Sequence, residues 1–142
     1  MTLALDNPAK PHLKRWTKAE FNEAVDRGWF VWDRRVFLFR GELIELPPMG
    51  SLHAFGISNL NDWLTETFKR PHRIRIQSPF DAPGESMPEP DGAVVTHEQM
   101  RRRPHPNQAL LLIEVADSSI ELDREKAFEY AAAGVPEYWI VN

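Results

Sequence analysis

A stripe of apolar residues with helical spacing runs through the middle of the chain. Its members recur at steps of four and three residues, and they are His53, Ile57, Leu60, Leu64 and Phe68. This spacing predicts an amphipathic helix with His53 at its N-terminal end, on the apolar face. A shorter helix is predicted after the capping box of Thr17 and Glu20, with Gly28 as its stop. A third is predicted from about Leu122 to Ala133.

Shorter segments rich in Val, Ile, Leu and Phe predict strands. The stretch Val31–Leu46 is broken by Arg40 and Gly41, which predicts a hairpin with a tight turn. The other predicted strands are Arg73–Gln77, Ala93–Thr96, Leu110–Ile113 running into Glu114, and Tyr138–Val141. Tyr138 and Trp139 are expected in the core, because a buried last strand needs such residues. Strands interspersed with helices predict an α/β fold.

The remaining segments indicate how the chain is organised. Residues 1–15 form a polar leader that contains proline and is expected to be loosely ordered. Residues 81–90 are expected to form a loop. After the strand that ends at Thr96, a basic, proline-rich loop is expected that runs through Arg101, Arg102 and Arg103 to Pro106. Since no internal repeat or linker interrupts the rest, residues 16–142 are predicted to form one domain.

Composition narrows the class of protein. With 142 residues, of which 42% are apolar, the chain can bury a real core, and the absence of cysteine excludes a disulfide scaffold and thiolate chemistry. No run approaches the roughly 18 apolar residues of a membrane helix, and Met1–Pro11 lacks the apolar centre of a signal peptide. A soluble, cytoplasmic protein without a membrane partner is expected. The net charge of −4 argues against a surface that coats nucleic acid generally.

One charged residue stands at the end of a predicted buried strand. Glu114 directly follows four apolar residues, and a carboxylate there is costly unless a cation or hydrogen-bond donors meet it. Lys126 lies on the following predicted helix, and Asp91 precedes another apolar run. Two acids and a lysine in these positions predict a metal site with a cationic partner.

Two of these positions have a simpler interpretation. Asp123 and Lys126 are one helical turn apart, and such pairs are commonly exposed and contribute little. Against this, Lys126 shares its helix face with Tyr130, and that face is expected to turn toward Glu114. His53 is either a hydrogen-bonded core histidine or a group that borders a site below the start of its helix.

The motifs in the last third of the chain resemble those of the Uma2 family of predicted endonucleases. The matching segments are Glu114–Ser119, Asp123–Lys126, Tyr130 and Ala133–Trp139, with Gly41–Glu45, Pro48, His53, Pro79 and Pro88–Asp91 upstream. This family is placed in the PD-(D/E)xK nuclease superfamily. The resemblance implies a restriction-endonuclease-like fold, in which helices flank a mixed central β-sheet.

The resemblance also implies a chemistry. Asp91 and Glu114 would hold Mg²⁺ or Mn²⁺, with the carbonyl of Val115 as a third protein ligand. The metal would polarise a scissile phosphate, and Lys126 would neutralise developing charge or position the attacking water. In more familiar members of the superfamily the lysine lies two residues after the second acid, where this chain has Ala116.

The resemblance adds accessory positions. Many relatives carry a glutamate where this chain has Phe37, and Glu45 is a candidate replacement, although a solvated hairpin glutamate explains it equally well. His53 is expected to border the site once the family pattern is added. Gln77 is a candidate hydrogen-bond donor to a ligand, while an exposed polar residue at a strand edge is the simpler account.

The distribution of charge and the end of the chain give expectations about binding partners. Several basic residues are candidates for gripping the phosphates of DNA, although single charge runs are more often solvated loops. They are the run Arg101, Arg102 and Arg103, with Lys69, Arg70, Arg73 and Arg75 elsewhere. The overall acidity favours weak or partner-assisted DNA binding. Relatives usually continue with a further strand beyond Asn142, which favours a homodimer or a place within a longer protein.

Two other classes of function remain open. A non-catalytic binding or assembly module with the nuclease fold is favoured by Phe37, where an acid is expected. A hydrolase that uses Asp91 and Glu114 as an acid and base pair without metal would resemble a glycosidase. That second class leaves Lys126 without a role.

Overall fold

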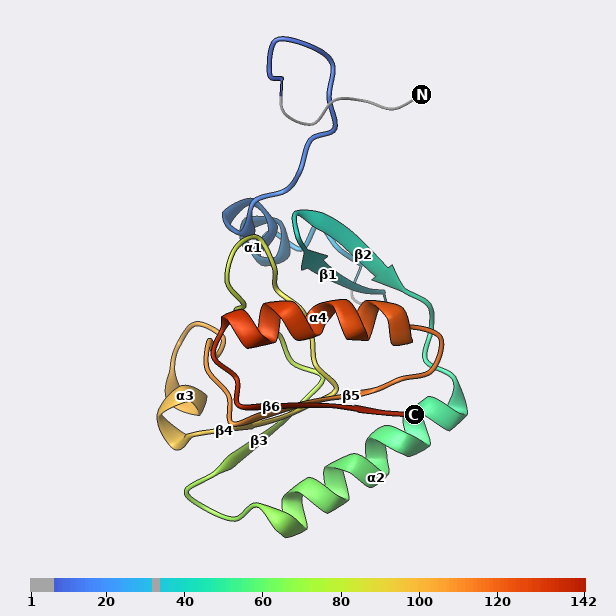
Figure 1. The fold of residues 1–142 in the computed structure, drawn as a ribbon, viewed down its shortest axis with the longest axis vertical. Helices are drawn as coiled ribbons and strands as arrows, with labels where there is room; N and C mark the ends of the chain where they lie inside the picture. The colour runs from blue at the N-terminus through green and yellow to red at the C-terminus, as the bar shows by residue number, and fades with distance from the viewer. Residues whose placement is uncertain (1–6, 32–33) are drawn as a thin grey trace.

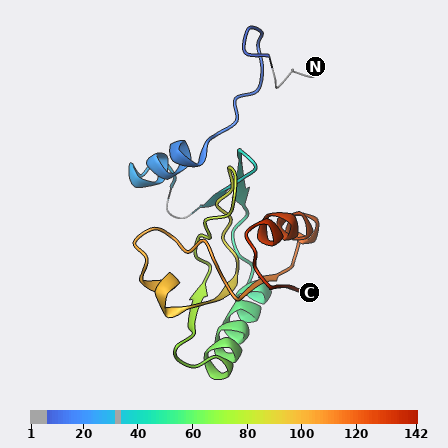
Figure 2. The same ribbon diagram turned by 60° about the vertical axis from the view of Figure 1, so that its left-hand side comes forward.

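The computed structural model describes residues 7–31 and 34–142 (Figures 1 and 2). Part of the predicted leader, residues 1–6, lies outside the described residues. Residues 7–15 are exposed and form no helix or strand, and they extend away from the rest of the chain (Figure 1).

Helices and strands alternate along the chain largely where the sequence predicts them. The helices are α1 (Lys18–Asp26), α2 (Ser51–Thr67), α3 (His97–Arg101) and α4 (Ile120–Ala132). The strands are β1 (Arg35–Phe39), β2 (Glu42–Leu46), β3 (Arg73–Ile76), β4 (Gly92–Val95), β5 (Leu111–Val115) and β6 (Glu137–Val141). The capping box that starts α1 is present, because Thr17 and Glu20 each accept a hydrogen bond from the other's backbone N–H.

Four strands form a mixed sheet in the order β3-β4-β5-β6. The first three are antiparallel, and β5 pairs with β6 in parallel through the crossover helix α4. The strands β1 and β2 form a separate antiparallel hairpin, as predicted. None of the helices in the described residues is long and apolar enough to cross a membrane.

The two long helices cover opposite faces of the sheet (Figure 1). Leu64 of α2 packs with Val94 and Ile113 on one face, while Tyr130 of α4 packs with Val95 and Leu112 on the other. Side chains alternate between the faces of a strand, so each apolar run serves both helices. This arrangement explains why all of β4 and all of β5 except Val115 at its end are buried.

A close approach by α2 fixes the start of β4. A Cβ atom on Gly92 would lie 3.0 Å from Leu60 Cδ2 and 3.0 Å from Leu64 Cδ1. Glycine therefore allows the backbone next to Asp91 to lie directly against this helix. The packing of α2 thus helps to position the first predicted acid.

The hairpin packs beside α4, on the side of the helix away from α2 (Figure 1). Arg40 at its turn pairs with Glu125 at 3.0 Å and with Glu129 at 2.7 Å, both on α4. Leu38 forms an isolated bridge with Met87, which ties β1 to the loop before β4. Phe37 is 1% exposed and turns toward α4, where its ring centroid lies 4.9 Å from Lys126 Nζ.

Two details differ from the sequence prediction. The helix α3 replaces the start of the predicted basic loop, since Thr96 caps it by accepting a hydrogen bond from the backbone N–H of Gln99. Trp139 was expected in the core but is 39% exposed, and it packs against Trp63 of α2. Because β6 is an edge strand, its outer face is only partly covered, whereas Tyr138 on the other face packs against the core.

Candidate active site

The strand register brings Asp91 and Glu114 together. Ala93 pairs with Leu112 and Gly92 with Ile113, so the next positions along the antiparallel ladder are Asp91 and Glu114. Ala93 and Leu112 both face α4, and by alternation the two acids share that face. Each acid is 4% exposed. Two carboxylates that are distant in sequence therefore lie side by side in a buried setting.

Hydrogen bonds hold Asp91 in place. Its Oδ2 atom accepts a bond of 2.8 Å from the backbone N–H of Val115, the residue after Glu114. The Gln77 side-chain amide lies 3.5 Å from Oδ1, and the Gln77 backbone N–H donates to the Asp91 carbonyl at 3.1 Å. His53 Nε2 lies 3.8 Å from Oδ1. The structure thus places both Gln77 and His53 beside the first acid.

Lys126 lies between two carboxylates of the same buried cluster. Its Nζ atom donates to Glu114 Oε2 at 3.1 Å and to Asp123 Oδ1 at 3.2 Å. Lys126 is 3% exposed and Asp123 is 1% exposed, so the interpretation as a surface pair is wrong. Ser119 donates its hydroxyl to Asp123 at 3.1 Å, which fixes the helix-borne partner of the lysine.

The electrostatics around Glu114 favour an added cation. Burial raises the pKa of the Glu114 carboxyl well above its usual value, Lys126 acts in the opposite direction, and Asp91 and Asp123 raise it further. The Oε1 atom of Glu114 is buried and has no hydrogen-bond partner within residues 7–31 and 34–142. A buried carboxylate oxygen without a donor is costly, so this atom is suited to a metal ligand.

Three further residues at the site were not predicted from the sequence as site residues. Burial raises the pKa of Glu89, and Arg35, whose Nη2 lies 3.6 Å from Glu89 Oε2, partly opposes this. Lys126 also acts on the Glu89 carboxyl, which places Glu89 near the cluster. Glu89 stands two residues before Asp91, and that spacing is a usable clue. The positions of Arg35 and Phe37 depend on how the hairpin packs, which the sequence does not reveal.

Other predicted residues lie elsewhere. Glu45 is paired in register with Val36, so it faces away from Phe37, and it forms an ion pair with Arg34 at 3.0 Å. The run of arginines lies at the end of α3 and just beyond it, and it forms no side-chain hydrogen bond or ion pair with the described site residues. Its members are Arg101, Arg102 and Arg103.

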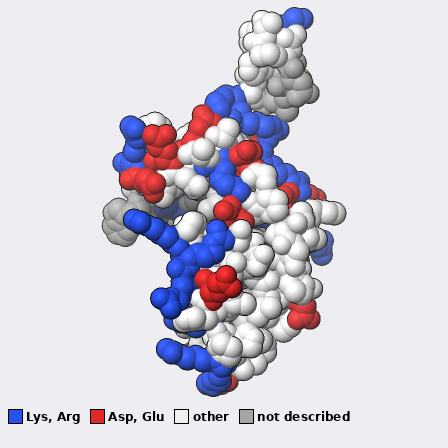
Figure 3. Space-filling model, turned by 90° about the vertical axis from the view of Figure 1, so that its left-hand side faces the viewer, with Lys and Arg blue, Asp and Glu red and all other residues white. Residues whose placement is uncertain are grey.

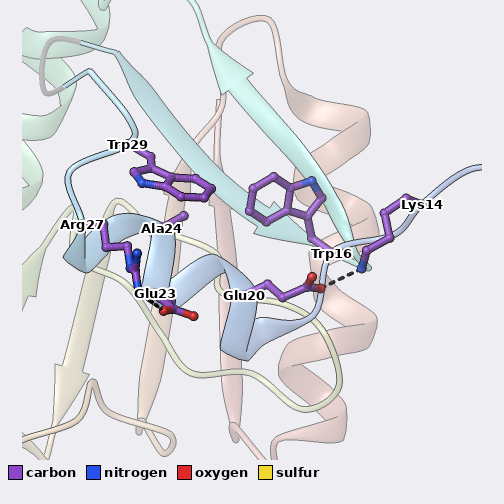
Figure 4. Close-up of a pocket in the computed structure, with 7 residues that line it drawn as sticks. All are labelled: Lys14, Trp16, Glu20, Glu23, Ala24, Arg27 and Trp29. Atoms are coloured by element: carbon purple, nitrogen blue, oxygen red, sulfur yellow. Dashed lines mark hydrogen bonds and ion pairs between the residues drawn. The ribbon is translucent and has the colours of Figure 1, made fainter.

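Two hollows differ in their relation to the acids. One is lined by Arg35, His53 and Ser119 among others, and it provides an approach to the buried cluster. Another lies between Trp16 and Trp29 on the outer side of α1 and contains none of the predicted site residues (Figure 4).

The donor set fits a hard divalent cation. No group of three or more His, Cys, Asp or Glu side chains is arranged as a ligand set in the part of the chain that the structure describes. Two carboxylates and the Val115 carbonyl remain, and Mg²⁺ is commonly bound through one or two carboxylates while substrate and water supply other ligands. The cluster also holds four carboxylates and two cations, Lys126 and Arg35. Its carboxylates are Glu89, Asp91, Glu114 and Asp123.

Comparisons with known proteins agree with this fold. The crystal structure of "a putative nuclease belonging to DUF820" from Anabaena variabilis matches with a TM-score of 0.71 and 15% identity. The match covers 87% of this chain and 72% of that one, and it confirms the predicted mixed α/β fold. No curated protein matches the chain significantly. The family described as "Uma2: Putative restriction endonuclease" matches residues 29–142. The chain therefore belongs to the Uma2 family, which carries the description "Putative restriction endonuclease".

Proposed function

We propose that this protein is a metal-dependent endonuclease that hydrolyses phosphodiester bonds of DNA. The observation that carries the proposal is the pairing of Asp91 with Glu114 on one face of the sheet, with the Lys126 amine 3.1 Å from Glu114. Membership of a nuclease family supports it. Acids on a well-hydrated surface would not need a buried cation to balance their charge, whereas Lys126 is only 3% exposed.

Asp91, Glu114 and the Val115 carbonyl are the groups that would hold Mg²⁺ or Mn²⁺. The bound ion would polarise the scissile phosphate and make a coordinated water more acidic. Asp91 keeps its orientation through the Val115 N–H, so the second acid and the support of the first come from one stretch of β5. The burial of both acids limits competing water, which strengthens electrostatic interactions at the site.

Lys126 and His53 supply positive charge or protons from two helices. Lys126 is held by Glu114 and Asp123, so its ammonium is oriented before substrate arrives and can stabilise negative charge on the phosphate. His53 lies 3.8 Å from Asp91 and lines the approach hollow, where it can exchange a proton with bound water or with a leaving oxygen. Gln77 limits the rotation of Asp91.

Phe37 favours one competing function. Its buried ring lies against Lys126. From the family resemblance, an acid is expected at this position. A site with one acid fewer is consistent with a non-catalytic module that binds nucleic acid or a protein partner. A metal-free acid and base pair is less well supported, since the amine of Lys126 occupies one oxygen of Glu114.

Cleavage of DNA tests the proposal. The native protein should cut plasmid and linear duplex in Mg²⁺ or Mn²⁺, and Asp91→Asn should lower the rate by at least about a thousandfold because a metal ligand is lost. Glu45→Gln is a matched control, since it removes a carboxylate that the structure leaves outside the cluster. Cleavage that survives in chelator, or an equal loss in the two variants, would contradict the metal-dependent mechanism.

A further inference from the structure

The basic residues between positions 14 and 40 are all ion-paired. Each Lys and Arg between positions 14 and 40 lies within ion-pair distance of an Asp or Glu. They are Lys14, Arg15, Lys18, Arg27, Arg34, Arg35 and Arg40. This region therefore offers little unbalanced positive charge to a partner.

The next group of basic residues is not neutralised. Between positions 69 and 103 seven Lys and Arg side chains have no carboxylate within ion-pair distance among the residues that the structure places. They are Lys69, Arg70, Arg73, Arg75, Arg101, Arg102 and Arg103. Figure 3 shows one face of the molecule on which basic side chains (blue) gather in the lower left, while acidic (red) and basic ones are mixed above them. The protein therefore has a basic region although its net charge is −4.

Two of these arginines lie on the same sheet face as the acids. Arg73 pairs in register with Val95, and Arg75 pairs with Ala93, both of which face α4. The alternate residues of β3, Ile74 and Ile76, pack on the opposite face with α2. β3 is an edge strand, and both arginines remain partly exposed.

The same row continues directly to the active site. Same-face positions of a strand are spaced by roughly 6.6 Å, so Arg73 and Arg75 are neighbours along one face of β3. Gln77 directly follows the end of the strand with a φ of 47°, and its side-chain amide lies 3.5 Å from Asp91 Oδ1. Two arginines on β3 and an amide just beyond it therefore lead toward the first acid.

Neither arginine forms an ion pair with a carboxylate among the described residues. Arg75 Nη2 lies 3.4 Å from Nδ1 of His105, and Arg73 Nη1 lies 3.4 Å from Nδ1 of His97. Arg75 is partly buried, and this burial lowers the pKa of its guanidinium. Guanidinium groups bind phosphate through paired hydrogen bonds, so a phosphate would supply the missing counter-charge.

We propose that Arg73, Arg75 and Gln77 form a track on β3 that binds the sugar-phosphate backbone of DNA and leads it to Asp91. This inference rests on the proposed nuclease function and names the surface that holds the substrate. The sequence analysis named Arg73 and Arg75 only within a wider set of basic residues around the run of three arginines, and the strand register singles out these two. The track uses backbone contacts, so it confers affinity and register rather than sequence preference.

Basic residues on an edge strand also have a simpler use. Charged side chains on such strands prevent the edge from pairing with other chains. That role requires positive charge at β3 but no contact with DNA. The experiment must therefore separate loss of DNA binding from loss of solubility.

The test is the salt dependence of DNA binding in chelator, where no cleavage occurs. Fluorescence anisotropy with a labelled duplex and a labelled single strand would compare the native protein with the double variant Arg73→Gln, Arg75→Gln. Two lost phosphate contacts should weaken binding severalfold and should lower the slope of log K against log salt by about 1.8 for duplex and about 1.4 for single strand. The double variant Arg73→Lys, Arg75→Lys should retain most of the slope.

The control is a double variant with the same change in charge, Lys14→Gln with Arg27→Gln. Both side chains are exposed and ion-paired on or beside α1 (Figure 4). An unchanged slope in this control with a reduced slope in the β3 variant supports the track. Equal losses in both variants, no DNA binding by the native protein, or aggregation of the β3 variant with an unchanged slope would each overturn it. A separate Mn²⁺ titration shows whether the nuclease proposal fails instead.

Discussion

The cluster under α4 and the row along β3 have opposite charge imbalances. In the cluster, four carboxylates surround two cations, and one buried oxygen of Glu114 has no hydrogen-bond partner among the described residues. Along β3, Arg73 and Arg75 contact the rings of His97 and His105, and neither forms an ion pair with a described carboxylate. The first region lacks a cation and the second lacks an anion. A divalent metal and a phosphate backbone would complete both, which is the combination that a metal-dependent nuclease brings together.

Loss of the buried cation should have the largest effect on stability. Lys126→Met leaves Glu114 and Asp123 without their shared partner and should lower the free energy of unfolding by about 3–5 kcal/mol. Lys14→Met removes an exposed pair and should cost less than about 1 kcal/mol. Urea denaturation of both variants measures the difference. Similar small losses of unfolding free energy in both variants would show that the buried cluster is solvated and does not differ from an exposed ion pair.

A side chain at position 92, at the start of β4, should disturb the cluster of acids but not the arginines on β3. Gly92→Val places atoms against Leu60 and Leu64 and should cost about 1–3 kcal/mol through overpacking. Because Asp91 is adjacent, cleavage should fall as well, while DNA affinity in chelator should stay near the native value. Urea denaturation and anisotropy check the two parts. A variant with native stability would indicate that α2 does not constrain this strand.

The pH dependence of stability should reveal the buried carboxyl group of Glu114. The folded-state pKa of Glu114 is raised above the ordinary value of 4.5, so its contribution to stability is fully present below that value. It is lost as the pH rises through the folded-state pKa. Glu114→Gln should remove this loss, so thermal melts in chelator from acid to neutral pH should fall less steeply. Glu89→Gln should act in the same direction through a less buried group. Identical profiles for native protein and Glu114→Gln would contradict the assignment.

The smallest effect is expected for the link between the hairpin and α4. Arg40→Ala breaks two partly exposed ion pairs and should lower stability by about 1 kcal/mol or less. The salt slope of DNA binding should not change, because Arg40 is neutralised in the free protein. Thermal melts and anisotropy check this prediction. A reduced slope would extend the DNA-binding surface to the hairpin.

The elements that can be predicted from sequence are those with a local cause. The capping box of α1 and the turn at Arg40 and Gly41 are set by neighbouring residues, and both are present. Trp139 was misplaced because hydrophobicity does not reveal that β6 lies at a sheet edge. The short helix α3 was missed because five residues give too little periodicity to recognise.

The candidate site divides in the same way. Asp91 precedes an apolar run and Glu114 follows one, while Lys126 shares a predicted helix face with Tyr130. These local signals make the three residues recognisable, and the structure brings them together. Arg35 reaches the cluster only through the packing of the hairpin against the body of the chain. The β3 row depends on register and on the absence of nearby acids, which are properties of the folded chain.

The most direct test of the central claim is Mn²⁺ binding in the presence of a short DNA duplex, for the native protein and for Asp91→Ala. The paired acids predict saturable binding by the native protein and its loss in the variant, with the fold retained in circular dichroism. Equal binding by both proteins, or none by either, would contradict the assignment of Asp91 and Glu114 as a metal site.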